Sequence, residues 1–482
     1  MRLLNARVLD LADASLSPTT TVELAGAELA DEEELDLEGR ILAPGLWDHH
    51  VHMDLWAQQR SRHDVSAATS AAHCSLLVGQ ALAERGASRR DELLVGRGFR
   101  DAVWADSPSA ELLDRHSGAT PVVLLSGDLH AVWLNTAALR LFGIEGEQGH
   151  LVERAAFEVE EALNQLTPQA LDRLVDDCLT EAAALGVVGI TDMEQAWTVG
   201  AWRRRSARPG GSRLRVRAAV YAKDLPRALA EGLRTGDVLS ADGLVTMGPL
   251  KVIGDGSLTA RTALCHQPYP HGAHPDEQGH GVANVSPAAL TALMGRAHAG
   301  GIECAIHAIG DAANSITLDV FEATGAAGSI EHAQLVSPDD VARMARLGVV
   351  ASVQPNHLVD DASVMDVLWH DRAGNAFPLA DMARQVVRMR FGSDAPVSAL
   401  QPWQAVHDAV TRRAGGTSWH PEQCLDLSTA LLSSSNGVSR VRPGDGDAIV
   451  LEHDPFQLDA ADLPGVRSVL TVVAGRVVHR SL

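Results

Sequence analysis

Eight short runs rich in valine, isoleucine and other apolar residues recur along this chain of 482 residues. From the second run onward, most of the intervening stretches are rich in alanine and leucine with the spacing of amphipathic helices. Strand and helix in alternation, eight times over, are typical of an α/β fold, a (β/α)8 TIM-like barrel. The runs lie at 41–52, 186–192, 214–221, 250–255, 302–308, 329–333, 349–355 and 386–394.

One connection is too long for a plain barrel. It extends from residue 52 to about 184, far beyond the usual length of a βα loop. It contains strand-like runs of its own at 93–96 and 121–125. We therefore expect an inserted subdomain at about 85–175 that forms a lid over the barrel mouth.

The two ends of the chain alternate like half-buried strands, as in Val469–Val478 near the C-terminus. Neither end is long enough to bury a core alone. We expect 1–44 and 435–482 to pair as one small composite β-sandwich, beside a barrel that occupies 45–434.

Charge and cysteine usage restrict the class of protein. The formal net charge is −22, and the sequence has no clustered basic face, which argues against a nucleic-acid or anionic-membrane partner. The five cysteines are widely spaced and include no CxxC pair, a pattern typical of free thiols in a reducing compartment. The start of the chain lacks the apolar core of a signal peptide, and no apolar run approaches the ~18 residues of a membrane span. We expect a cytoplasmic protein.

Metal-ligating side chains stand at the ends of five of the predicted strands. His50 and His52 are two apart in the first run, so both imidazoles can face the same side and reach one ion. An HxH pair alone is weak evidence in a chain with 21 histidines. The other strand ends add candidates, and the carboxyl ends of (β/α)8 strands form the active-site mouth. The full set is His50, His52, Lys251, His307, His332 and Asp394.

Lys251 stands out by composition. The chain has 40 lysines and arginines, of which only Lys223 and Lys251 are lysine. A buried lysine can lose its proton, and its neutral amine can take up carbon dioxide to become an anionic carbamate ligand, whereas arginine keeps its proton. The alternative is that a GC-rich genome has left a few lysines by accident.

Taken together, the motifs resemble the amidohydrolase superfamily. Within it, the chain is similar to the branch of N-substituted formamide deformylases and proteins described as exoenzyme regulators, over nearly its whole length. The segments that carry the resemblance are 44–52, 121–130 with Asn135, 251–258, 307–311, 331–334, 354–357, 392–396 and 443–448.

The resemblance implies a divalent metal centre, plausibly with two zinc ions. His50, His52 and Asp394 would hold one ion, His307 and His332 the other, and a carboxylated Lys251 would bridge them. Asp394 would also move the proton during catalysis. Imidazole and carboxylate ligands suit zinc independently of the resemblance.

Four residues are candidates to contact a small-molecule substrate, namely His130, Arg261, Gln354 and His357. Arg261 could instead pair with an acid, and His357 could cap a helix. One departure from the family concerns the second strand, where many relatives carry a His-Asp pair and this chain has Gly189-Ile190-Thr191-Asp192-Met193-Glu194. Asp192 and Glu194 are then rim carboxylates or, in our preferred interpretation, solvated charges.

The sequence favours a metal-dependent hydrolase that cleaves a C–N bond in a small amide, formamide, cyclic amide or carbamate. Two alternatives remain open. The same centre could act on esters, lactones or phosphotriesters, or the protein could be a non-catalytic regulator with a vestigial metal site. The relatives also suggest a homodimer.

Overall fold

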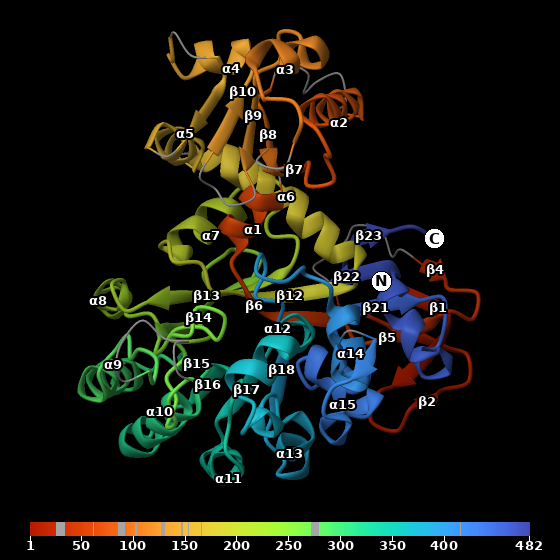
Figure 1. Ribbon diagram of the computed structural model, residues 1–482. Coiled ribbons are helices and arrows are strands. Elements are labelled where there is room, and N and C mark those ends of the chain that lie inside the picture. The colour runs from red at the N-terminus through yellow and green to blue at the C-terminus, as the bar shows by residue number, and fades with distance from the viewer. Residues whose placement is uncertain are drawn as a thin grey trace. The chain divides into compact units, whose positions relative to one another are not determined.

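A barrel of eight parallel strands forms the centre of the larger part of the protein (Figure 1). The computed structural model describes residues 1–25, 34–60, 62–84, 92–101, 104–126, 131–145, 148–152, 154–164, 166–270, 279–414 and 416–482. The barrel strands, in their order around the sheet, are β6 (Leu46–Val51), β12 (Val187–Asp192), β13 (Arg215–Tyr221), β14 (Val245–Ile253), β15 (Cys304–Ala308), β16 (Gly328–His332), β17 (Val350–Val353) and β18 (Met389–Phe391). All eight coincide with runs predicted from the sequence.

Backbone hydrogen bonds bring the first and last strands together. Asp394 N donates to His50 O at 2.7 Å, and His52 N donates to Ala395 O at 2.9 Å. The barrel strands are buried on both faces, β12 and β17 along their whole length, which explains their continuous apolar sequences.

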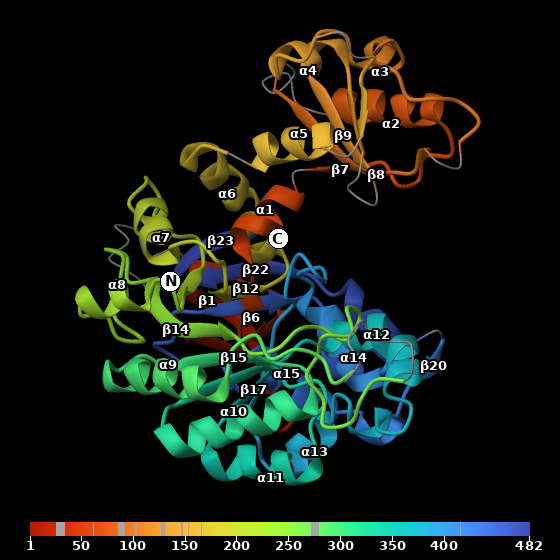
Figure 2. The ribbon, with the colours of Figure 1, turned by 60° about the vertical axis from the view of Figure 1, so that its left-hand side comes forward.

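Helices cover the outside of these strands, as Figure 2 shows for α9, α10 and α11. Their ends are set by local sequence: Ser286 and Ser337 cap α9 and α11, each followed by proline in the first turn. The helices of this part are α7 (Thr198–Ser206), α8 (Leu225–Ala230), α9 (Pro287–Ala299), α10 (Asp311–Thr324), α11 (Pro338–Leu347), α12 (Pro355–Leu368), α13 (Leu379–Arg384), α14 (Pro402–Thr411) and α15 (Leu427–Ser434).

The two ends of the chain pair with each other in a mixed sheet. Parallel pairing of β1 with β5 is followed by antiparallel pairing of β5 with β21, which joins the N-terminal and C-terminal segments. A buried core that includes Leu3, Val8, Leu42, Val450 and Leu470 accompanies it. The strands are β1 (Arg2–Asp10), β2 (Ser15–Leu16), β3 (Thr20–Glu23), β4 (Glu34–Asp36), β5 (Ile41–Ala43), β21 (Ala448–Leu451), β22 (Ser468–Val473) and β23 (Arg476–Arg480).

The long connection forms a second compact unit, Asp54–Cys178, whereas the sequence suggested a subdomain at about 85–175. It has a five-stranded mixed sheet with an apolar core on each face. Its role as a lid stays a prediction. Its elements, with the helices at its two boundaries, are α1 (Met53–Arg60), β7 (His63–Asp64), α2 (Ala71–Glu84), β8 (Leu94–Phe99), α3 (Ala110–Ser117), β9 (Val122–Ser126), β10 (Ala131–Leu134), α4 (Thr136–Leu141), β11 (His150–Val152), α5 (Arg154–Asn164) and α6 (Pro168–Ala184).

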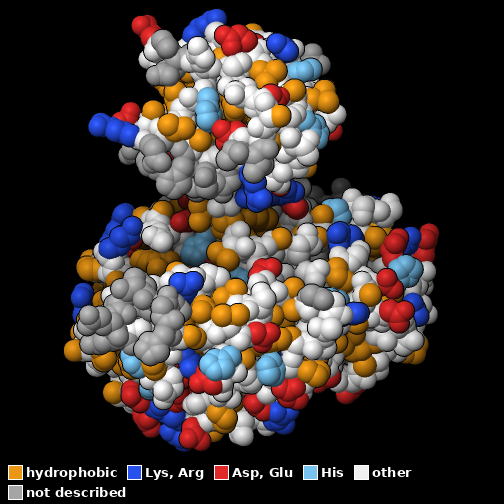
Figure 3. Space-filling model, in the orientation of Figure 1, with side chains coloured by type: hydrophobic (Ala, Val, Ile, Leu, Met, Phe, Trp, Pro, Cys, Tyr) orange, Lys and Arg blue, Asp and Glu red, His pale blue; other side chains and the backbone are white. Residues whose placement is uncertain are grey.

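The described residues show two further properties, one of the helices and one of the surface. None of their helices combines the length and apolar character that crossing a membrane requires. Basic and acidic side chains are interspersed on the face drawn in Figure 3, without a large basic field.

Candidate metal centre

The six candidate ligands converge at the carboxyl ends of the barrel strands. His50 Nε2 and His52 Nε2 lie 3.4 and 3.2 Å from Asp394 Oδ1, and Lys251 Nζ lies 3.2 Å from His50 Nε2. The His332 ring is centred 5.1 Å from that of His50 and 4.4 Å from that of His307. Five strands that are distant in sequence therefore bring one lysine, four histidines and one aspartate into a single cluster.

Within this cluster, two overlapping groups have the geometry to hold a cation. The first is His50, His52 and Asp394; the second is His332, His357 and Asp394, and the ligand atoms in each group lie within 4.8 Å of one another. The first matches the predicted ligand set. In the second, His357, predicted as a substrate contact, takes the place predicted for His307.

His307 is oriented by its other ring nitrogen. Its Nε2 lies 3.2 Å from the Gly256 carbonyl oxygen and 3.4 Å from Asp255 Oδ1. Donation from Nε2 to the carbonyl leaves a lone pair on Nδ1, the arrangement common to metal-binding histidines.

The unpaired imidazole nitrogens of the cluster indicate that its side chains fit a divalent cation. Within the described residues, His332 Nδ1 and His357 Nε2 are buried and have no hydrogen-bond partner. Buried polar atoms are normally paired, so each such nitrogen needs an explanation. A cation between these imidazoles and Asp394 would satisfy both.

The backbone around the ligands is strained and closely packed. His332 and Asp394 adopt positive φ angles of 72° and 57°, which side-chain-bearing residues rarely do and which cluster at functional sites. At Gly392, a Cβ atom would lie 2.6 Å from the backbone nitrogen of His50, so only glycine permits this approach. Asp48 fixes the same junction, accepting from His50 N at 3.0 Å and Ser393 N at 3.1 Å.

Glu331 orients His50, a role that the sequence interpretation missed. Its Oε2 lies 2.7 Å from His50 Nδ1, and its Oε1 accepts a hydrogen bond from Ser329 Oγ. Burial alone would raise the pKa of Glu331, but the hydrogen bond from His50, with the other polar contacts of the carboxylate, outweighs it and lowers that pKa to about 2. An ionised Glu331 holds the proton of His50 on Nδ1 and turns the Nε2 lone pair toward Lys251 and Asp394.

Electrostatics keep the cluster in a metal-binding protonation state. Burial lowers the pKa values of His50 and His332, and it lowers that of His307 to about 3, so these rings are neutral at pH 7. Burial also lowers the pKa of Lys251. For Asp394, burial opposes ionisation, but His50 and the hydrogen bond to His52 hold its pKa well below the usual range.

Asp255 is a second residue whose role the sequence did not reveal. Its carboxylate accepts from the backbone nitrogens of Leu264, Ile309 and Gly310 at 2.9–3.0 Å, which anchors the loops after β14 and β15. Burial raises its pKa to about 7. The motif 251–258 marked Asp255 in the sequence, but nothing there showed that it would contact His307.

The predicted substrate contacts have different outcomes. Gln354 is fully buried and its Nε2 lies 3.5 Å from His50 Nδ1. His357 lies in the first turn of α12, where Gln354 is the N-cap and makes no side-chain capping bond. Arg261 is exposed in a turn with φ of 58°, and His130 lies outside the described residues.

The interpretation of Asp192 as a solvated charge was wrong. Asp192 is 1% exposed. Its Oδ2 accepts from Trp202 Nε1 at 2.7 Å, and its Oδ1 accepts from Met53 N at 3.2 Å. The two donors belong to α7 and to the segment after β6, and the sequence could not show that they would contact Asp192. Glu194 is half-buried.

Known proteins resemble this chain along most of its length. The profile of the Amidohydrolase family matches residues 33–479. The putative amidohydrolase YtcJ of Bacillus subtilis is 27% identical over 93% of this chain and 91% of its own length. N-substituted formamide deformylase of Arthrobacter pascens is 24% identical over 95% of this chain and 91% of its own. An uncharacterized metal-dependent hydrolase of Pyrococcus horikoshii, known from its crystal structure, has the same fold, with a TM-score of 0.76, 24% identity and coverage of 95% of this chain and 99% of that one.

Proposed function

This chain belongs to the amidohydrolase family, and we propose that it is a metal-dependent hydrolase that cleaves a C–N bond in a small amide, formamide, cyclic amide or carbamate. The observation that carries the proposal is the position of Asp394. Its Oδ1 lies 3.4 Å from His50 Nε2 and 3.2 Å from His52 Nε2, and its Oδ2 lies 3.9 Å from His357 Nε2. A single carboxylate thus faces both candidate cation positions.

The residues that would hold the metal are the two cation groups together with His307 and Lys251. Zinc is the ion we favour, because nitrogen and carboxylate oxygen ligands suit it. The chemistry supplied by a bound divalent ion is Lewis acidity, which polarises a carbonyl and lowers the pKa of a water from ~15.7 toward ~7.

We propose that Lys251 is carboxylated. Lys251 is 2% exposed, and burial favours the neutral form of its amine, which is the form that attacks carbon dioxide. A bond forms between Nζ and the carbon of carbon dioxide, one proton leaves, and a carbamate anion results. Its two oxygens provide a ligand that can bridge two cations.

Asp394 is the residue that we assign to proton transfer. Its carboxylate accepts a proton from the attacking water and returns it to the nitrogen of the breaking C–N bond, so that an acid and an amine leave. Gln354 lies at the same cluster and is proposed to orient the substrate, with Arg261 and His130 as further candidates. His357, predicted as a substrate contact, is assigned instead to the second cation group. The Arthrobacter relative, named for N-substituted formamides, motivates formamides as the first compounds to test.

The test has two parts. Metal analysis of the purified protein should show a divalent ion, and chelation should remove both the ion and any turnover, with recovery on readdition of zinc. Turnover is then screened on N-formyl, N-acyl and cyclic amides and carbamates, with esters, lactones and phosphotriesters in parallel. Cleavage confined to the second set would replace the C–N assignment. Metal-loaded protein that turns over none of these compounds would favour the regulator alternative.

A further inference from the structure

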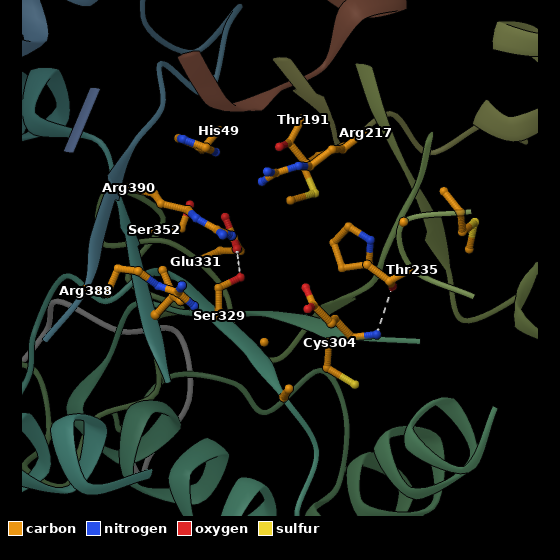
Figure 4. A pocket seen from close by; sticks show the side chains of 18 of the residues that line it. His49, Thr191, Arg217, Thr235, Cys304, Ser329, Glu331, Ser352, Arg388 and Arg390 are labelled. Atoms are coloured by element: carbon orange, nitrogen blue, oxygen red, sulfur yellow. Dashed lines mark hydrogen bonds between the residues drawn. The ribbon is translucent and has the colours of Figure 1, made fainter. Parts of the chain in front are cut away.

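A cavity of about 320 Å³ occupies the barrel at the end opposite to the metal ligands (Figure 4). Its walls include the first residues of three strands, Cys304 of β15, Gly328 of β16 and Val350 of β17. The metal ligands lie at the carboxyl ends of the strands. The cavity therefore lies on the other side of the barrel interior from the proposed catalytic mouth and reaches inward to His49 and Glu331, which adjoin the ligands His50 and His332.

Three arginines line this cavity: Arg217 from β13, Arg388 just before β18, and Arg390 within β18. Figure 4 shows their guanidinium groups pointing into the same space from two sides. Arg217 also lies over the Trp47 ring at 4.6 Å. Three positive groups gathered here stand out in a chain whose net charge is −22.

Glu303 and Glu331 line the same cavity, and the charge of Glu303 acts on Arg217 and Arg390 without forming an ion pair with either. Within the described residues, none of the three arginines makes a hydrogen bond or an ion pair within 4 Å through its side chain. Burial, followed by repulsion from Arg390, lowers the pKa of Arg217 to about 10. Arg217 and Arg390 are partly buried, whereas Arg388 is exposed. Partly buried arginines normally pair with acids, because unpaired burial of a charge is costly. The arrangement is the one expected of a site whose negative partner is a ligand.

Buried neutral donors complete the cavity wall. His49 is 3% exposed and stacks on Trp47 at 5.5 Å, and both of its ring nitrogens are buried without a hydrogen-bond partner in the described part of the chain. The same is true of Ser352 Oγ. Both residues line the cavity, so an imidazole and a hydroxyl are available there beside the arginines.

We propose that this cavity is a binding site for a small organic anion, a molecule that carries a carboxylate or a phosphate group. Guanidinium groups bind both anions through paired N–H donors. The cavity volume falls at the lower end of the range for small-molecule sites and exceeds what a bare ion needs. Glu303 and Glu331 also line the cavity, so we expect the anion to bind on the arginine side, away from these carboxylates.

The cavity shares one wall residue with the metal centre. Glu331 contacts His50 through Oε2 and Ser329 through Oε1, and both Glu331 and Ser329 line the cavity. An anion could also bind directly to a metal ion, so the experiment must separate the two places.

Binding is measured by calorimetry on the full chain, both metal-loaded and chelated, with inorganic phosphate, glycerol 3-phosphate, acetate and succinate. We expect at least one organic anion to bind, more tightly than acetate or phosphate, and to keep its affinity after chelation. Arg388→Gln and Arg390→Gln should each weaken binding by about tenfold or more, because a charge-assisted hydrogen bond is lost. Arg346→Gln is the matched control, since Arg346 is exposed and pairs with Glu322 on the outer helices.

Three results would overturn the proposal: no binding at millimolar concentrations, binding lost on chelation, or equal binding in the cavity variants and Arg346→Gln. Binding of inorganic phosphate in preference to every organic anion would overturn the claim that the ligand is organic. If a glutamine variant fails to fold, Arg388→Lys keeps the charge but loses the paired donors, and it should still weaken binding. None of these readouts depends on turnover, so they are independent of the proposed hydrolase activity.

Discussion

The two ends of the barrel use charged side chains in opposite ways. At the carboxyl end, Asp394 lies between His50 and His52, and Glu331 holds His50. At the amino end, Arg388 and its neighbours face a cavity with no acid at ion-pair distance among the described residues. The first end is preorganised by its own residues, and the second is completed only by a ligand. Substitutions at the two ends test this contrast, and the largest effect is expected at Lys251.

Lys251→Arg should reduce turnover by about a thousandfold or more, because guanidinium cannot form the proposed carbamate, on which several kcal/mol of metal-centred stabilisation would depend. Steady-state kinetics on the best substrate measure this. Lys251→Ala should regain part of the activity when short carboxylic acids are supplied. The control is Lys223→Arg, which changes the chain's other lysine at an exposed position. A fully active Lys251→Arg protein would show that this residue is not a ligand.

Asp394→Asn should lower kcat by about 10²- to 10⁴-fold, the usual contribution of a positioned acid or base. The amide keeps an oxygen that can still face the cations, so much of the metal should remain. Metal content by mass spectrometry and kcat are measured on the same preparation. Complete loss of metal would instead make Asp394 chiefly a ligand and would leave its role in proton transfer unsupported.

Glu331→Gln should weaken metal binding by about 10- to 100-fold, because a neutral amide no longer fixes the His50 tautomer. Competition with a chelator of known affinity gives the dissociation constant. Glu322→Gln, on the exposed face of α10, is the matched control. Equal affinities in the two variants would refute the orienting role of Glu331.

The sequence predicted the barrel and its carboxyl-end cluster because both depend on local signals. The β12 run is continuously apolar, and parallel strands necessarily collect their last residues, such as His332, at one mouth. Gln354 and His357 were also marked by motif. The functions of Glu331, Asp255 and Asp48 could not be assigned in this way, because each acts through contacts with segments distant in sequence.

The cavity at the amino end of the barrel also could not be predicted from the sequence. Arg217 and Arg390 are far apart in the sequence, and they face the same cavity only because the barrel closes. The spacing of Arg388 and Arg390, two apart at the start of a strand, was a usable signal, since such residues share a face. In a chain with 40 basic residues this signal is weak by itself. What singles out these arginines is that they face one cavity, and that depends on tertiary structure.

The smallest expected effect concerns His49, between the two ends. Burial, followed by repulsion from Arg390, holds the pKa of His49 well below its usual value. Above pH ~6.5 the ring is neutral in both folded and unfolded chains; below it only the unfolded chain gains the proton, so stability falls by up to about 1.4 kcal/mol per pH unit. Urea unfolding of His49→Gln at pH 7.5 and 5.5 should therefore show a smaller acid-induced loss than wild type, by about 1.4 kcal/mol, whatever the variant's overall stability. His298→Gln, at an exposed position on α9, is the control. Identical pH dependence in wild type and His49→Gln would mean that folding leaves the pKa of this imidazole unchanged, and would contradict the effect of burial on it.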